Sequence, residues 1–193
     1  MKIWTKTKVS INLTISGCVR LILILSTYII SISMNIQNHH PETLQTVPFV
    51  DINKYSGKWY EIASYPNRFQ RGCNCTTAEY TMTTSGYLKV ENRCNLESTT
   101  GPSSYIKGKA TVVKNSGNSK LKVQFFWPFK AKYWIIDLAA DYSYAVVSNP
   151  SRKYLWVLSR TPIMDDAIYN QILSRIHEKG FDLKKLKRTV QVK

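Results

Sequence analysis

The sequence is poor in histidine and in acidic residues. Its 193 residues include three histidines, at positions 39, 40 and 177, and 12 acidic residues against 27 lysines and arginines. None of the histidines lies in the alternating apolar segments described below. We therefore expect no Cys–His catalytic couple and no haem or zinc site with histidine ligands. No cofactor is expected.

The formal net charge of +15 is spread along the chain, and no nucleic-acid-binding motif accompanies it. We therefore expect no nucleic-acid partner. Two interpretations of the charge remain: a solvated face of a sheet, or contact with an anionic membrane surface.

Residues 1–33 contain no acidic residue and differ from the rest of the chain. Their apolar run, residues 21–33, is short for a membrane span and typical of a signal-peptide core. Two alternatives remain open. Residues 15–18 resemble a bacterial lipoprotein box with Cys18 as the lipidated residue, and residues 9–33 could form an uncleaved anchor. The expected location is the bacterial outer membrane or periplasm with lipidation, and extracellular otherwise. Residues 34–47 are predicted to be a linker, and residues 48–193 a single domain.

Helical patterns are almost absent between residues 48 and 161, where short apolar alternations are separated by turn signals. Eight strands are predicted, at residues 58–65, 76–82, 87–94, 105–113, 120–126, 133–138, 142–148 and 154–160. Because no crossover helix joins them, the strands should be antiparallel. Eight up-and-down strands close into a barrel just wide enough for one small ligand, so we predict an all-β fold.

One segment after the last strand has the helical period. Thr161 can cap the helix and Pro162 suits its first turn, while Lys179 and Gly180 end it. The predicted apolar stripe contains Met164, Ile168, Ile172 and Ile176. We expect this single helix to pack on the outer wall of the barrel.

Two motifs at the ends of the strand region resemble the lipocalin signature. Gly57-Lys58-Trp59-Tyr60 opens the first strand, and Leu158-Ser159-Arg160-Thr161-Pro162 follows the last one. In lipocalins the tryptophan closes the barrel floor and the arginine packs across its ring, as a cation–π pair. The segments 57–63, 66–69, 133–134, 141–142 and 154–162 are similar to one subgroup. That subgroup contains bacterial outer-membrane lipocalins, apolipoprotein D and plant temperature-induced lipocalins.

The resemblance implies a non-enzymatic carrier of a small hydrophobic ligand, such as a fatty acid or lysophospholipid, for membrane maintenance or stress response. Gly57, Trp59 and Arg160 would form the floor, and Phe69 with residues 127–129 would rim the opening. If Trp59 and Arg160 point inward, alternation predicts these cavity residues: Tyr80, Val90, Leu121, Val123, Phe125, Trp134, Tyr144 and Trp156. Related barrels also dimerise, so a homodimer is a further expectation.

Three cysteines follow residue 33, and in an oxidising compartment Cys94 should pair with Cys73 or Cys75. Pairing Tyr80 with Val90 places Cys94 opposite Thr76, so the strand register leaves both partners open. The resemblance favours Cys73 and makes Cys75 a spare thiol.

Two other function classes remain. One is a lipocalin enzyme that uses a reduced cavity thiol, Cys75 or Cys94, of lowered pKa. The other is a membrane-surface scaffold that docks its basic face on anionic lipid.

Overall fold

The computed structural model describes residues 43–192, and Thr43–Lys193 form one compact unit. The interpretations of residues 1–33 as a signal peptide, an anchor or a segment lipidated at Cys18 lie outside the described residues. The predicted linker also lies mostly outside them. However, Leu44 is buried and the Val47 amide donates to the Ile135 carbonyl, so residues 44–47 pack on the domain.

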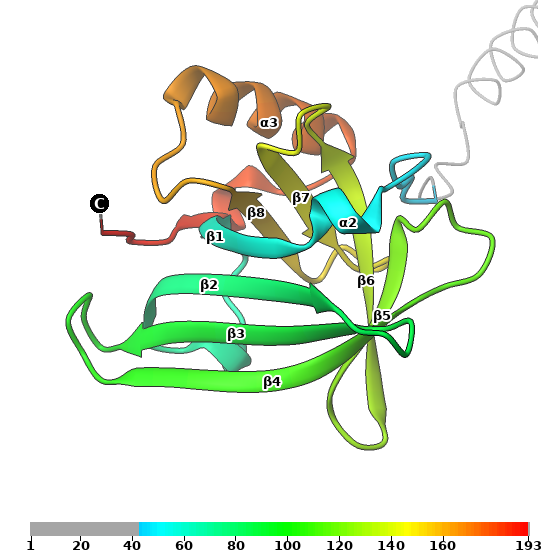
Figure 1. Ribbon diagram of the computed structural model, residues 1–193. Coiled ribbons are helices and arrows are strands. Elements are labelled where there is room, and N and C mark those ends of the chain that lie inside the picture. Colours follow the sequence, from blue (N-terminus) through cyan, green and yellow to red (C-terminus); the bar gives the residue numbers. More distant parts are fainter. Residues whose placement is uncertain (1–42, 193) are drawn as a thin grey trace, which may run out of the picture. The chain divides into compact units, whose positions relative to one another are not determined.

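The predicted eight-stranded antiparallel barrel is confirmed (Figure 1). Neighbouring strands pair in sequence order, and pairing of β1 with β2 closes the sheet on itself. Its strands are β1 (Gly57–Ser64), β2 (Cys73–Met82), β3 (Leu88–Leu96), β4 (Ser103–Val112), β5 (Lys120–Phe126), β6 (Phe129–Leu138), β7 (Tyr144–Ser148) and β8 (Leu155–Ser159).

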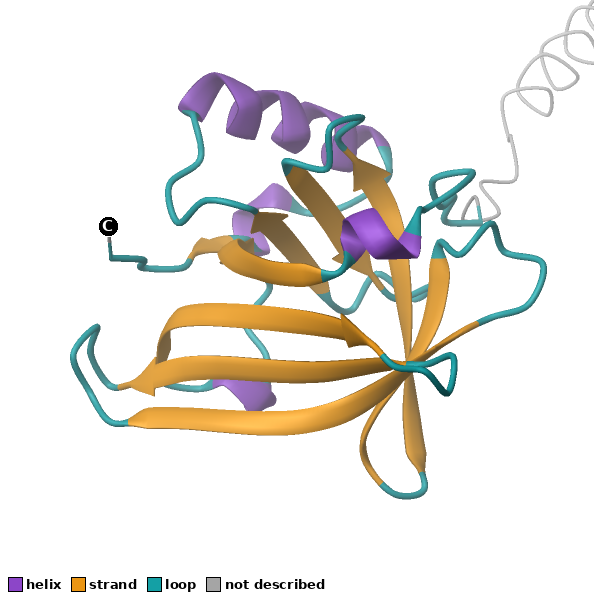
Figure 2. Cartoon of the chain, viewed as in Figure 1, coloured by secondary structure: helices purple, strands orange, loops and turns teal. Residues whose placement is uncertain are grey.

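Short elements complete the domain (Figure 2). Helix α2 (Ile52–Tyr55) precedes β1, and the 3-10 turn η1 (Arg68–Gln70) lies between β1 and β2. Helix α3 (Asp166–Glu178), the 3-10 turn η2 (Leu183–Lys185) and the short strand β9 (Lys187–Arg188) follow β8. Within residues 43–192, no helix combines the length and apolarity that a membrane crossing requires.

Alternation along the strands separates two apolar clusters. One cluster lies inside the barrel and includes Trp59, Tyr80, Leu121 and Leu158. The other lies between the barrel wall and α3, and it contains strand residues of the opposite parity together with Tyr169, Ile172, Ile176 and Phe181 of the C-terminal part. Helix α3 therefore covers the outer wall, as predicted (Figure 1).

The start of α3 differs from the prediction. Asp165, and not Thr161, is the N-cap: its carboxylate accepts from the amides of Ala167 and Ile168 at 2.9 and 3.1 Å. The Thr161 hydroxyl instead donates to the Ile163 carbonyl. The buried stripe also differs: Tyr169, Ile172 and Ile176 are buried at i, i+3, i+7 spacing, whereas Ile168 is 39% exposed.

Candidate functional site

The barrel floor is built around Trp59 and Arg160. The Trp59 side chain is fully buried, and the Arg160 guanidinium carbon lies 3.7 Å from the centre of its ring. The same guanidinium donates to the carbonyls of residues 54, 55, 56 and 58. A side chain on Gly57, which has φ +95°, would touch this group. One planar cation thus ties α2, β1 and β8 together, and burial lowers its pKa.

Six of the eight predicted cavity residues converge inside the barrel. Tyr80, Val90, Leu121 and Val123 belong to the inner cluster, and Phe125 and Trp156 pack against it. Gly108 makes room for Phe125, because a Cβ there would come within 2.7 Å of the Phe125 ring. These side chains form one continuous apolar wall above the floor.

Trp134 and Tyr144 do not join this group. Both pack against the outer cluster beside α3, and the Tyr144 hydroxyl accepts from Arg175 of that helix. The reason is the period of two along a strand: Tyr133 and Ile135 point inward, so Trp134 points outward. The prediction that they line the cavity is therefore wrong.

Three tyrosines form a polar group inside the barrel. Tyr80 belongs to the predicted cavity set, whereas Tyr55 and Tyr133 do not. The Tyr80 hydroxyl donates to that of Tyr133 at 2.8 Å, and the Tyr55 and Tyr133 hydroxyls lie 2.7 Å apart. Burial raises the pKa of Tyr80 to about 12 and the pKa values of Tyr55 and Tyr133 well above 10. All three phenols are therefore neutral at physiological pH. Three hydroxyl protons share two hydrogen bonds, so one proton has no acceptor among the described residues.

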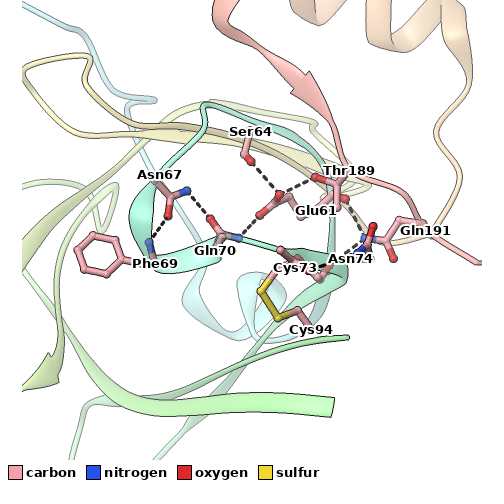
Figure 3. The surroundings of a disulfide bond; sticks show 12 residues. Glu61, Ser64, Asn67, Phe69, Gln70, Cys73, Asn74, Cys94, Thr189 and Gln191 are labelled. Atoms are coloured by element: carbon pink, nitrogen blue, oxygen red, sulfur yellow. Dashed lines mark hydrogen bonds between the residues drawn. A yellow bond between two sulfur atoms is a disulfide. The ribbon is translucent and has the colours of Figure 1, made fainter. Parts of the chain in front are cut away.

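Glu61 is a buried carboxylate near the other end of the barrel (Figure 3). It accepts hydrogen bonds from the side chains of Ser64, Thr189 and Gln70, and Gln70 in turn accepts from the Trp156 indole. This group was also missed, although the alternation from Trp59 places Glu61 on the inner face. The network links the inner wall to η1 and to the C-terminal segment.

The C-terminal segment fills a gap in the barrel wall. β1 pairs with β2 only at residues 57–60, and further along it pairs with β9. The Val190 carbonyl then accepts from the Cys75 amide of β2, while the Gln191 amide group donates to the carbonyls of Glu61 and Thr76. Residues 189–191 thus bridge the separated ends of β1 and β2.

A pocket of about 530 Å³ lies at this separation. Its lining includes Glu61 and Gln70 of the buried network and four cationic residues, Arg68, Arg71, Lys187 and Arg188. The volume is in the range of small-molecule sites. The four cations in its lining favour an anionic group.

The predicted Cys73–Cys94 disulfide is present (Figure 3). A bulge in β2 after Asn74 removes residues 75 and 76 from the ladder, which lets Cys73 reach Cys94. Cys75 is a free, half-buried thiol. No cluster of three or more metal-ligating side chains occurs in the part of the chain that the structure describes.

The sequence from residue 50 to residue 191 matches the family model of the lipocalin-like domain. The chain belongs to the lipocalin family. Its two signature motifs therefore have the structural roles that the resemblance implied, since Trp59 and Arg160 meet at the floor of a lipocalin barrel.

Similar curated proteins belong to the predicted subgroup. This lipocalin is 40% identical to the outer membrane lipoprotein Blc of Vibrio cholerae, over 76% of this chain and 85% of that protein. It is 36% identical to temperature-induced lipocalin-1 of Arabidopsis thaliana, over 77% and 83% of the two chains. For mouse apolipoprotein D the identity is 34%, over 73% and 77%.

Solved structures support the fold. Insecticyanin from the tobacco hornworm Manduca sexta superimposes with a TM-score of 0.63 at 18% identity, over 78% of this lipocalin and 85% of that chain. At this identity the likeness concerns the barrel architecture alone.

Proposed function

We propose that this lipocalin binds and carries one small hydrophobic ligand with a polar head, of the fatty acid or lysophospholipid class. The lipocalin family binds small hydrophobic ligands, and the similarity to Blc and apolipoprotein D supports a lipid. The observation that carries the proposal is the convergence of six cavity residues on one apolar wall inside a closed barrel.

The proposed contacts for the ligand's apolar chain are Tyr80, Val90, Leu121, Val123, Phe125 and Trp156. Each buried CH₂ of an acyl chain contributes about 0.8 kcal/mol, so a long chain binds without many polar contacts. Two polar features suit the head of such a ligand. The tyrosine group can donate its unused proton to an oxygen atom, and the cations that line the pocket can hold an anionic head.

We further propose that the protein is not an enzyme. The thiol mechanism required a reduced Cys75 or Cys94 facing the cavity. Cys94 is held in the disulfide with Cys73, and the free Cys75 lies outside the inner apolar cluster and the residues packed against it. Similar proteins are named as lipocalins, outer membrane lipoproteins or apolipoproteins. By the same similarity, we propose a membrane-attached or secreted location.

Native mass spectrometry of the purified full chain, followed by extraction and identification of lipids, tests the carrier proposal. We expect about one fatty acid or lysophospholipid per chain. A chain that purifies empty and does not bind added oleate or lysophospholipid would contradict the proposal.

Two matched tryptophan variants locate the ligand. Trp156 lies on the inner wall and Trp134 on the outer one, so each reports on one side of the barrel. Oleate should change the tryptophan emission of the wild type and of Trp134→Phe, and this change should shrink in Trp156→Phe. The opposite pattern would place the ligand outside the barrel.

A further inference from the structure

Four large aromatic side chains are exposed at one end of the barrel. Trp127 is 87% exposed, Phe129 77%, Phe69 65% and Phe126 64%. Phe69 lies in η1, and the other three form the tip of the β5–β6 hairpin, which extends away from the rest of the sheet in Figure 1. Because the strands alternate in direction, both loops lie at the end opposite the Trp59–Arg160 floor. Exposed aromatic groups of this size mark an interaction surface.

Lysines cover the outer face of the sheet behind this tip. Lys130 and Lys132 are exposed on β6, directly after Phe129. Lys109, Lys122 and Lys130 line one surface depression of about 100 Å³. Within residues 43–192, the ion pairs of the structure include none of these lysines.

The strand register places like charges opposite each other on this face. On this face, Lys122 of β5 pairs with Lys132 of β6. Directly opposed like charges destabilise a sheet, so the arrangement has a cost in the free protein. An anionic surface would remove that cost.

The loops at the same end are also basic. Residues 65–72 contain Arg68 and Arg71, and residues 149–154 contain Arg152 and Lys153, whereas Glu97 is the only acidic residue of the loop 97–102. Apolar aromatic tips and cations therefore occur together at one end of the molecule.

We propose that this end docks on an anionic lipid bilayer, with residues 126, 127 and 129 inserted at the boundary between headgroups and acyl chains. Tryptophan favours this boundary, and each lysine near an anionic membrane surface contributes about 1 kcal/mol. An apolar anchor combined with a basic patch supplies the two signals that stable membrane attachment requires. A second copy of this chain fits less well, because two such lysine faces repel each other.

Docking goes beyond the carrier function and does not depend on it. The docked end includes η1, which lines the pocket between β1 and β2, so a docked barrel would present that opening to the lipid. A protein that binds oleate in solution but not vesicles would retain the proposed function and lose this inference.

The first experiment measures co-sedimentation of the full chain with phosphatidylcholine vesicles, with and without phosphatidylglycerol. We expect binding that requires phosphatidylglycerol and weakens at high salt. The triple variant of the hairpin tip, Phe126→Ser/Trp127→Ser/Phe129→Ser, should weaken vesicle binding by roughly 100-fold or more. Phe49→Ser is the matched control, since Phe49 is 62% exposed beside the β4–β5 loop at the floor end, and it should bind like wild type. Equal loss in both variants would overturn the proposal.

A charge-matched pair tests the lysine face. Lys130→Glu/Lys132→Glu should weaken binding to phosphatidylglycerol vesicles by roughly 30-fold or more, from about 1 kcal/mol for each lysine lost. Lys54→Glu/Lys114→Glu makes the same change of net charge at the floor end and should have a much smaller effect. If both pairs weaken binding equally, net charge rather than this face is responsible, and the proposal fails.

Quenching by lipids with brominated acyl chains shows which tryptophan inserts. Residues 1–42 are the same in all variants, so they cannot cause a difference between them. Vesicles of these lipids should quench wild-type emission, and Trp127→Phe should lose most of that quenching. Unchanged quenching would show that another tryptophan inserts, which overturns the proposal. Two other results would also overturn the proposal. In one, the hairpin variant dissociates a dimer without a change in vesicle binding. In the other, the chain binds an acidic protein but no vesicles.

Discussion

Arg160 joins three parts of the chain at the barrel floor through one planar group. It stacks on Trp59 and donates to four backbone carbonyls between residues 54 and 58. Removing it leaves those carbonyls without this donor and exposes one face of the indole ring. Lysine at this position would keep the charge but could not reproduce the fork of donors.

We expect Arg160→Ala to lower the free energy of unfolding by roughly 2–4 kcal/mol, and Arg160→Lys by somewhat less. Urea denaturation followed by circular dichroism measures both. Arg68→Ala is the control, because Arg68 is exposed and stacks on the exposed Phe69, and it should cost less than about 0.5 kcal/mol. Equal stability of Arg160→Lys and wild type would show that charge alone suffices.

The buried tyrosines make the free energy of unfolding depend on pH in the alkaline range. Tyr80 has a folded-state pKa of about 12, and the pKa values of Tyr55 and Tyr133 are also raised. In the unfolded chain each phenol ionises near 10. Between these values the unfolded state has released protons that the native state still holds, so stability decreases as the pH rises. Below about pH 9 these groups contribute their full stabilisation.

Denaturant midpoints measured from pH 8 to pH 12 test this dependence. The free energy of unfolding should be flat up to about pH 9 and then fall by about 1.4 kcal/mol per pH unit for each group of this kind. Tyr80→Phe should reduce the slope, whereas Tyr105→Phe, at an exposed position, should leave it unchanged. A slope that does not differ between the two variants would contradict the assignment.

At the scale of single elements, helix α3 provides a test of its corrected start. Asp165 satisfies two amides of the first turn, so Asp165→Ala should cost about 1 kcal/mol of stability. Thr161→Ala removes hydroxyl bonds to the Ile163 carbonyl and the Ser159 hydroxyl but none to an amide of α3, and it should cost less. Thermal denaturation of both variants measures the difference. A larger loss for Thr161→Ala would restore the predicted cap.

The strands could be predicted from the sequence, but the first residue of helix α3 could not. Alternation in β5 separates Leu121 and Val123 from the lysines without ambiguity, so the strands and the inner wall there were predictable. The chain from residue 161 to residue 166 offers two suitable caps, Thr161 before proline and Asp165, and composition alone does not choose between them.

Strands that are apolar on both faces explain the errors in the cavity set. In β6, four apolar residues, Tyr133, Trp134, Ile135 and Ile136, are consecutive, because the inner face packs in the barrel cluster and the outer face packs against α3. The predicted strand begins at Tyr133, after the outward Lys130 and Lys132, and no polar residue marks the outside within residues 133–136. The pattern of these four residues therefore places Trp134 on the wrong face. The same argument applies to Tyr144, which precedes Ala145 and Val146 in β7.

At the scale of the whole molecule, the barrel is closed in two different ways. Near the floor β1 and β2 pair directly, and beyond residue 60 the segment 189–191 connects them. Little in the sequence indicates this connection, since the segment is short and mostly polar. Only the folded barrel brings the edges of β1 and β2 to opposite sides of it.

Deletion of residues 189–193 tests whether this segment holds the wall together. The deletion removes five hydrogen bonds: that of the Cys75 amide, that to the Ile62 carbonyl, two to Glu61 and one to the Thr76 carbonyl. At about 0.5–1.5 kcal/mol for each hydrogen bond, we expect a loss of roughly 3–7 kcal/mol. The amide of Cys75 should also exchange with deuterium much faster. Deletion of residues 192 and 193 alone leaves every one of these bonds and is the control. If Cys75 stays equally protected in both deletions, the wall closes without the segment, and β1 and β2 must pair beyond residue 60 in its absence.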